Sequence, residues 1–138
     1  MCSLLGSRPI VAFVATTNPA SAKEFYAEVL GLRFVSEDPF ALVFDAGGTS
    51  LRVATVRELR PAGYTVLGWN VPNIAESVRG LVARGVVFER YDWIPQDADG
   101  VWRSPSGAAV AWFKDPDGNT LSLTESPRDK QPSAAPTR

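Results

Sequence analysis

The sequence contains no histidine among its 138 residues, and this absence excludes more chemistry than any other feature of the composition. Imidazole is the usual general base near neutral pH and a common ligand of transition metals. Nucleophile pairs of the Ser-His and Cys-His types are excluded as well. Any catalysis would have to depend on carboxylates, arginine, lysine, tyrosine or backbone groups.

Cysteine is almost absent. Cys2 is the only one in the chain, so no disulfide can form within it. A catalytic thiolate needs an ordered base beside it, and Cys2 lies at a terminus that we expect to be loosely held. We therefore interpret Cys2 as incidental.

The chain also lacks a charge excess, a long apolar run and the usual cofactor motifs. Its 14 basic and 15 acidic residues nearly cancel, and no basic cluster indicates nucleic acid as a partner. No segment approaches the roughly 20 apolar residues that span a bilayer, and the first residues are not apolar enough for a signal peptide. Glycine-rich nucleotide-binding motifs and the GxSxG motif are absent. We expect a soluble, cytoplasmic protein without cofactor or membrane partner.

Two segments carry complete helix signals. Asn18 is placed as an N-cap, Pro19 follows at the first helical position, and Gly31 lies just beyond the expected end. Asn73 and Gly85 mark the ends of the second segment in the same way. Each segment has a single apolar stripe at helical spacing, which predicts a helix that packs by one face.

The surroundings of the two helices form an internal repeat. An apolar stretch typical of a strand precedes each helix, and a hairpin pattern follows each, at residues 40–56 and 108–125. Each half is therefore predicted to run strand, helix, strand, strand, strand. The second half is longer because of residues 92–107, which are rich in Pro, Gly and Asp and predict a long, functional or disordered loop.

Two such modules, with "FYAEVLGL" after the Asn-Pro cap and "FKDPDGNTLSL" near the end, resemble the vicinal oxygen chelate superfamily of glyoxalase I, extradiol dioxygenases and bleomycin-resistance proteins. The resemblance implies an α+β fold in which two βαβββ modules form a curled mixed sheet around a cleft, with the helices on the outer face. It covers residues 9–125, with module one at 9–56 and module two at 64–125. We expect an N-terminal arm at 1–8 and a flexible tail at 126–138.

The resemblance also implies where metal-dependent members of the family place their ligands. The matching positions, on the first and last strand of each module, are Val11, Arg52, Val66 and Ser122. Valine has no lone pair to donate, and a guanidinium that is always charged repels a dication. We therefore expect no metal site.

Without a metal, the cleft would be a small-molecule site. Arg52 is the main candidate anchor, because a guanidinium can bind a planar anion through paired hydrogen bonds; the alternative is a solvated arginine paired with a nearby acid. Trp93 and Trp102 lie in or beside the loop, where an indole stacks on a flat ligand, closes a dimer interface or covers the core. The candidate ligand-binding residues are Phe13, Ser50, Arg52, Asn70, Trp93, Trp102, Trp112, Thr120 and Ser122.

Among family members, the sequence most resembles the bleomycin-resistance branch, which sequesters drugs without transforming them. This implies a homodimer that binds a small organic molecule, aromatic or carrying an anionic group, with no metal or cofactor. One alternative is a lyase, isomerase or dioxygenase-like enzyme with non-standard catalytic residues, although no carboxylate pair is spaced for acid-base chemistry and we assign no catalytic residue. Another is a protein whose aromatic loop binds a partner protein.

Overall fold

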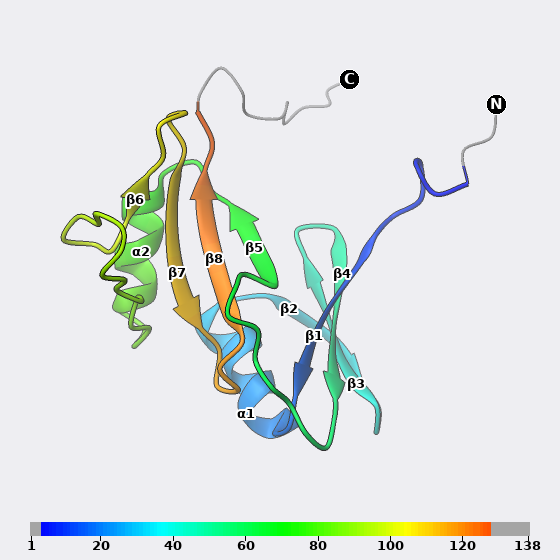
Figure 1. Cartoon of the computed structure of the whole chain (residues 1–138). Helices are drawn as coiled ribbons and strands as arrows, with labels where there is room; N and C mark the ends of the chain where they lie inside the picture. Colours follow the sequence, from blue (N-terminus) through cyan, green and yellow to red (C-terminus); the bar gives the residue numbers. More distant parts are fainter. Residues whose placement is uncertain (1–3, 128–138) are drawn as a thin grey trace. The chain divides into compact units, whose positions relative to one another are not determined.

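The computed structural model describes residues 4–127, and the contacts within the chain divide it into two compact units (Figure 1). Within the described range, the first unit contains residues 4–67 and 115–119, and the second contains 68–114 and 120–127. Part of the expected arm and most of the expected tail lie outside the described residues.

The first unit is one βαβββ module. Its sheet has the strand order β1-β4-β3-β2, with β1 parallel to β4 and the other neighbours antiparallel. The elements are β1 (Val11–Thr16), α1 (Pro19–Glu24), a π-helical turn η1 (Phe25–Val29), β2 (Arg33–Glu37), β3 (Ala41–Ala46) and β4 (Thr49–Thr55).

Local sequence signals explain the helix of the first unit and the side of the sheet that it covers. The Asn18 side chain accepts a hydrogen bond from the backbone N–H of Ser21 at 3.2 Å, as expected of an N-cap. Tyr26 is fully buried, and its ring centroid lies 5.9 Å from that of Phe44 on β3. Phe44, Leu51 and Val53 are fully buried, so the side of this sheet that faces the helix is its buried side.

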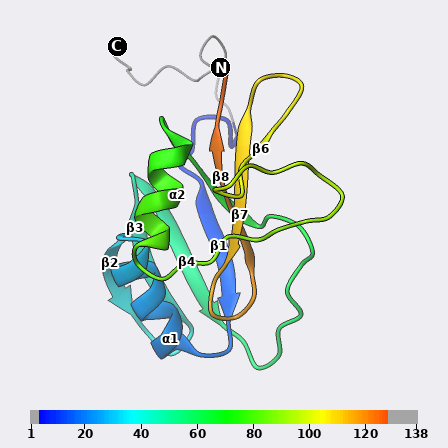
Figure 2. The same ribbon diagram turned by 90° about the vertical axis from the view of Figure 1, so that its left-hand side faces the viewer.

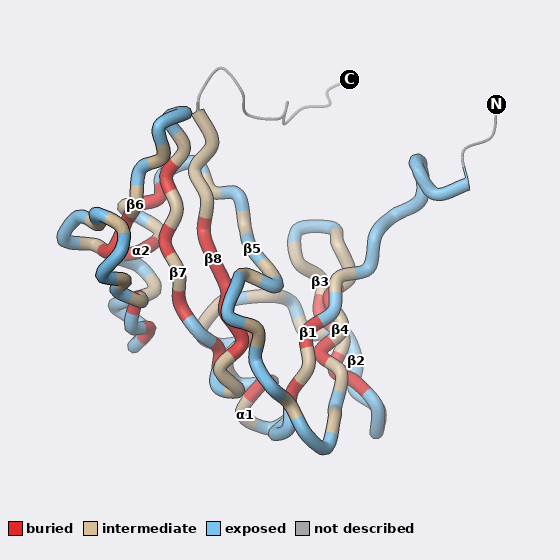
Figure 3. The backbone as a smooth tube through the Cα atoms, in the orientation of Figure 1, coloured by how far each residue is buried: buried red, intermediate tan, exposed pale blue. Residues whose placement is uncertain are grey.

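The second unit repeats the plan. Its sheet has the order β5-β8-β7-β6. The elements are β5 (Leu67–Asn70), α2 (Ile74–Val82), β6 (Trp102–Arg103), β7 (Ala109–Lys114) and β8 (Thr120–Glu125). Helix α2 packs against β7 and β8 (Figure 2). Many of the buried residues of this unit lie on these two strands, and Ile74 and Val78 on α2 are buried as well (Figure 3).

Two side chains fix the start of α2. The Asn73 side chain accepts from the backbone N–H of Glu76 at 3.1 Å, and the Glu125 carboxylate on β8 accepts from the N–H of Ile74 at 2.9 Å. The first is the predicted N-cap. The predicted α+β class and the two βαβββ modules are confirmed, with one four-stranded sheet in each module. None of the helices described between residues 4 and 127 has the length and apolar character needed to cross a bilayer.

The turn between β7 and β8 packs with the first unit. Asp115 is only 6% exposed, and its carboxylate accepts from the Tyr26 hydroxyl at 2.7 Å and from the Asn119 side-chain amide at 2.8 Å. The same carboxylate accepts from the backbone N–H groups of Asp117 at 3.0 Å and Asn119 at 2.9 Å. The Gly118 N–H donates to the Asp115 carbonyl, which closes the predicted β-turn.

The second carboxylate of the turn holds the segment that joins β1 to α1. Asp117 accepts from the hydroxyl of Thr16 and from both the N–H and the hydroxyl of Thr17, the latter two at 2.9 Å. Asn119 adds a bond from its side-chain amide to the Ala15 carbonyl at 2.8 Å. The acidic residues of the motif therefore serve as hydrogen-bond acceptors within the first unit.

Two glycine substitutions should have opposite effects on stability. Gly118 has a φ of +89°, and an added Cβ would lie 3.2 Å from the Pro61 Cγ, so Gly118→Ala should cost about 1 to 2 kcal/mol. Gly80 lies inside α2, where an added Cβ meets nothing within 4 Å, so Gly80→Ala should gain about 0.5 to 1 kcal/mol. Urea unfolding of both variants measures the two changes in the free energy of unfolding. A Gly118→Ala protein as stable as the wild type would contradict the positive φ at this position.

Candidate functional site

Arg52 and Phe13 lie on the open face of the first sheet, the face opposite α1. Leu51 and Val53, the neighbours of Arg52 in sequence, are fully buried on the helix side. Because strand side chains alternate, Arg52 points to the other face, and Phe13, its partner in the register, lies on that face too. The strand register places Phe13 of β1 and Val43 of β3 on either side of Arg52. Phe13 is 60% exposed and Arg52 is half-buried. The open face thus presents one cation between two apolar side chains.

Asp45, an acidic residue of β3 on the same face as Arg52, has other partners. Asp45 lies opposite Ser50 in the register, and its carboxylate contacts the Arg33 Nε at 3.6 Å and accepts from the Gly48 N–H at 3.1 Å. Arg52 takes part in none of the ion pairs found between residues 4 and 127, among them Lys23–Glu37, Arg33–Asp45 and Arg79–Asp99.

The four positions that correspond to family metal ligands do not fit a divalent ion. Val11 and Val66 are 47% and 40% exposed and offer only hydrocarbon, and Arg52 brings a positive charge. Ser122 is the only oxygen donor of the set and is 6% exposed. Among the described residues, no three His, Cys, Asp or Glu side chains are grouped so that they could hold a metal.

Four aromatic side chains of the second unit form a continuous series of ring contacts, which we call the aromatic row. Trp93 stacks on Tyr91 with centroids 5.4 Å apart, and Tyr91 meets Trp112 edge-on at 5.5 Å. Trp112 in turn lies 6.2 Å from Trp102. Trp93 is 76% exposed and the other three are half-buried. The row therefore combines ordered rings with an open indole at one end.

The row lies on the open face of the second sheet. Ala111 and Phe113 are fully buried on the other face, where Phe113 contacts the rings of Phe88 at 5.3 Å and Trp69 at 6.4 Å. Alternation along β7 turns Trp112 to the opposite side. The register pairs Trp102 on β6 with Val110, which lies on the same face as Trp112.

The loop that carries Trp93 is folded around one side chain. The Gln96 amide donates to the carbonyls of Glu89 at 3.0 Å and Gly100 at 2.8 Å, and it accepts from the N–H of Tyr91 at 2.8 Å. The Arg90 guanidinium adds two bonds of 2.6 Å to loop carbonyls. These bonds hold Tyr91 in place. The sequence pattern indicated the tryptophans as candidates, but no pattern in the sequence indicated Gln96.

The remaining candidate ligand-binding residues are either more buried than Phe13 and Trp93 or lie apart from Arg52 and the aromatic row. Ser50 is half-buried beside Asp45 in the register, and Asn70 is exposed at the end of β5, where its side-chain oxygen accepts from the Ser126 hydroxyl at 3.3 Å. Thr120 and Ser122 share the face of Trp112, but they are only 4% and 6% exposed. Phe13, Ser50 and Arg52 come together in the first unit, and Trp93, Trp102 and Trp112 come together in the second.

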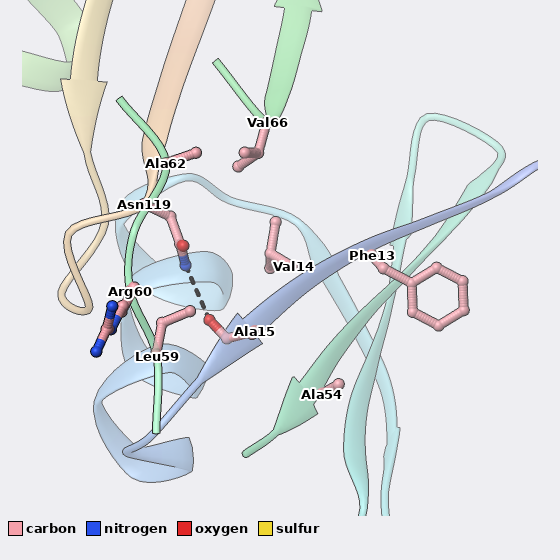
Figure 4. Close-up of a pocket in the computed structure, with 9 residues that line it drawn as sticks. All are labelled: Phe13, Val14, Ala15, Ala54, Leu59, Arg60, Ala62, Val66 and Asn119. Atoms are coloured by element: carbon pink, nitrogen blue, oxygen red, sulfur yellow. Dashed lines mark hydrogen bonds between the residues drawn. The ribbon is translucent and has the colours of Figure 1, made fainter. Parts of the chain in front are cut away.

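A cavity of about 350 Å³ in the first unit borders Phe13 (Figure 4). Apolar side chains form most of its wall, and the Asn119 amide is already bonded to the Ala15 carbonyl beside it. The volume is at the lower end of the range for small-ligand pockets. The lining residues are Phe13, Val14, Ala15, Ala54, Leu59, Arg60, Ala62, Val66 and Asn119.

Solved structures with the same fold include both enzymes and binding proteins. A member of the glyoxalase/bleomycin resistance protein/dioxygenase superfamily from Sphaerobacter thermophilus DSM 20745 is 25% identical, with a TM-score of 0.69 over 87% of this chain and 98% of that chain. TnmS3, an antibiotic binding protein from Streptomyces sp. CB03234, is 21% identical, with a TM-score of 0.67 over 91% of this chain and 100% of that chain.

A lactoylglutathione lyase from Agrobacterium tumefaciens is 18% identical, with a TM-score of 0.67 over 87% of this chain and 94% of that chain. No curated protein sequence matches the chain. The expected resemblance to the vicinal oxygen chelate group is confirmed by a family model that covers both modules. Because that model matches residues 9–123, the chain belongs to the Glyoxalase/Bleomycin resistance protein/Dioxygenase superfamily.

Proposed function

We propose that this chain is a metal-independent protein that binds flat organic molecules on the aromatic row and does not transform them, as in the sequestration of a drug or metabolite. The observation that carries the proposal is the row itself, four rings joined by three successive contacts on the open face of a sheet, with Trp93 76% exposed. Rings held by their neighbours provide stacking area at a low entropic cost.

The donor chemistry of the four metal positions supports metal independence. Two valines, an arginine and a buried serine do not provide the carboxylate or imidazole ligands that a divalent ion needs. TnmS3 supports a binding role within this fold, since it is an antibiotic binding protein. The likeness to the lyase shows that the fold alone does not decide between binding and catalysis.

An enzymatic alternative without histidine would need a carboxylate as general base, and two carboxylates of the long loop are engaged in other contacts. The Asp97 side chain accepts from the N–H groups of Asp99 and Val101 at 2.9 and 3.0 Å. Asp99 forms an ion pair with Arg79 at 3.2 Å. Neither is placed as a general base with a partner group, which favours the binding function.

Arg52 is proposed as a separate contact for an anionic group on the open face of the first unit. Its position between Phe13 and Val43 limits its solvation, and a guanidinium can hold a carboxylate through two parallel hydrogen bonds. We also propose a homodimer, as the resemblance implied, and a location in the cytoplasm. Light scattering of the purified protein tests the dimer.

Substitutions in the aromatic row should weaken ligand binding without unfolding the protein. We expect Trp93→Ala and Trp112→Ala each to reduce the affinity for flat aromatic compounds by about tenfold or more, because truncating an aromatic side chain that anchors a ligand costs about 2 kcal/mol. Isothermal titration calorimetry with a panel of such compounds, in buffer containing EDTA, measures the effect. Arg52→Ala should lower the affinity only of compounds that carry an anionic group.

Phe40→Ala is the matched control for the row, because Phe40 is 78% exposed and lies outside it. Its affinity for the same compounds should equal that of the wild type. The proposal fails if both tryptophan variants bind as well as Phe40→Ala does. It also fails if the purified protein holds a stoichiometric divalent ion whose removal abolishes binding.

A further inference from the structure

We infer that the aromatic row selects flat organic cations, and that Glu89 supplies the opposing negative charge. This inference rests on the proposed function and names the ligand class of the same surface. Three observations support it: the position of Glu89, the hydrogen bonds and positions of the neighbouring basic side chains, and the partial negative charge on the faces of aromatic rings.

Backbone contacts place Glu89 beside the centre of the row. Phe88 forms a bridge with Phe113 and packs its ring on the buried side of the sheet, with centroids 5.3 Å apart. The Glu89 N–H donates to the carbonyl of Trp112 at 2.8 Å. Because successive side chains of an extended segment point to opposite sides, the Glu89 carboxylate lies on the open face with Trp112.

The charge of Glu89 acts on the row. The pKa of Tyr91 is raised above its ordinary value, first by burial and second by the negative charge of Glu89. Glu89 is itself half-buried, and among residues 4–127 it takes part in none of the ion pairs. Partial burial reduces solvent screening, so this carboxylate attracts a nearby cation more strongly than a fully solvated one would.

None of the ion pairs found between residues 4 and 127 joins a neighbouring basic residue to Glu89. The Arg90 guanidinium keeps its charge, but its donors are directed to the carbonyls of Asp97 and Ala98, at 2.6 Å each, and not to the Glu89 carboxylate. Arg103 pairs with Ala109 and alternates to the other face from Trp102. Lys114 is the basic residue of β7 on the face of Trp112, and it is exposed at the end of that strand. Screening by water weakens its influence there.

The rings reinforce the preference for positive charge. An aromatic face carries partial negative charge, and indole attracts a cation more strongly than the other aromatic side chains do. A flat cation would therefore gain both ring stacking and the attraction of Glu89. A neutral molecule of the same shape would gain the stacking alone, and an anion would be repelled by the carboxylate.

A charge series on a single ring system tests the inference. N-methylacridinium, acridine and acridine-9-carboxylate have the same three fused rings and, at mildly alkaline pH, carry positive, zero and negative charge. Isothermal titration calorimetry of the full chain should show the cation binding about tenfold more tightly than acridine, and the anion more weakly than acridine. The difference between cation and neutral compound should shrink as the salt concentration rises.

Glu89→Gln should bring the affinity for N-methylacridinium close to that for acridine, while the affinity for acridine stays unchanged. Glu58→Gln is the matched control, because it removes the same charge from an exposed residue of the first unit. Equal binding of the cation and acridine by the wild type would overturn the inference but leave the proposed function standing. Failure of all three compounds to bind, in the wild type as well, would instead count against the proposed function.

Discussion

Asp115→Ala should lower the free energy of unfolding by about 3 to 4 kcal/mol, a loss comparable to the truncation of a buried core side chain. The carboxylate is 6% exposed and accepts four hydrogen bonds, from Tyr26, Asp117 and twice from Asn119. Its removal leaves the buried Tyr26 hydroxyl and Asn119 amide without that acceptor. Buried donors that lose their acceptor cost about 1 to 3 kcal/mol each, and relaxation recovers part of the sum.

Two further variants separate the role of the carboxylate from that of a surface charge. Asp115→Asn keeps an oxygen for the two backbone donors but turns an amide toward Tyr26 or Asn119, so it should lie between the wild type and Asp115→Ala. Asp92→Ala removes an exposed carboxylate and should change stability by no more than about 0.5 kcal/mol. Urea unfolding measures all three. A loss below about 1 kcal/mol for Asp115→Ala would mean that the turn is not held as the structure shows.

The structural role of this turn was only partly visible in the sequence. Asp-Pro-Asp-Gly predicts a β-turn from local rules, and the Gly118 N–H to Asp115 bond confirms it. The bonds to Tyr26 and Thr16 join residues 89 and 101 positions apart. No local propensity encodes such a pairing, so the sequence located the turn without revealing its partners.

The helices show the opposite situation, because their signals are local. Asn18 and Asn73 were predicted as N-caps from their position before an apolar stripe, and both side chains accept the expected backbone hydrogen bond. The internal repeat then gave the order of elements in each module. One detail was not foreseen, since the first helix ends in a π-helical turn, where the Leu30 N–H donates to the Phe25 carbonyl at 2.9 Å.

Strand alternation gives the face that a residue occupies but not how much covers it. In the structure, Arg52 and Trp112 lie on the open faces of their sheets, and both are half-buried there. Thr120 and Ser122 lie on the same face as Trp112, and these two are nearly fully buried. Burial depends on neighbours that are distant in sequence, whereas a strand has a period of two from its own geometry.

The aromatic row was predicted only as separate tryptophans. Each had several interpretations, because a lone indole in a loop covers a core as readily as it binds a ligand. Tyr91 links Trp93 to Trp112, and this link depends on the conformation of a loop that Gln96 organises through three hydrogen bonds. A single polar residue in a long loop carries no pattern that would have identified it.

The stability of the wild type should fall as the pH rises above about 10, and Tyr26 should be the main cause. The pKa of the Tyr26 hydroxyl is raised well above its ordinary value by burial, by the charge of Asp115, by the hydrogen bond to Asp115 and by the charge of Asp117. Above about pH 10 the unfolded chain ionises this tyrosine while the folded chain keeps its proton. The unfolded state then binds fewer protons, so the free energy of unfolding decreases, by up to about 1.4 kcal/mol per pH unit.

Tyr26→Phe separates this titration from the loss of the hydrogen bond. The variant should be less stable than the wild type near neutral pH, because Asp115 loses a donor, but its stability should decline less steeply in alkaline solution. A residual slope is expected from Tyr91, whose pKa is raised by burial and by Glu89, and Tyr91→Phe should remove that part. Urea unfolding at a series of alkaline pH values measures the slopes. Equal slopes in the wild type and Tyr26→Phe would show that the folded chain ionises Tyr26 as readily as the unfolded chain does, which the buried hydrogen bond to Asp115 opposes.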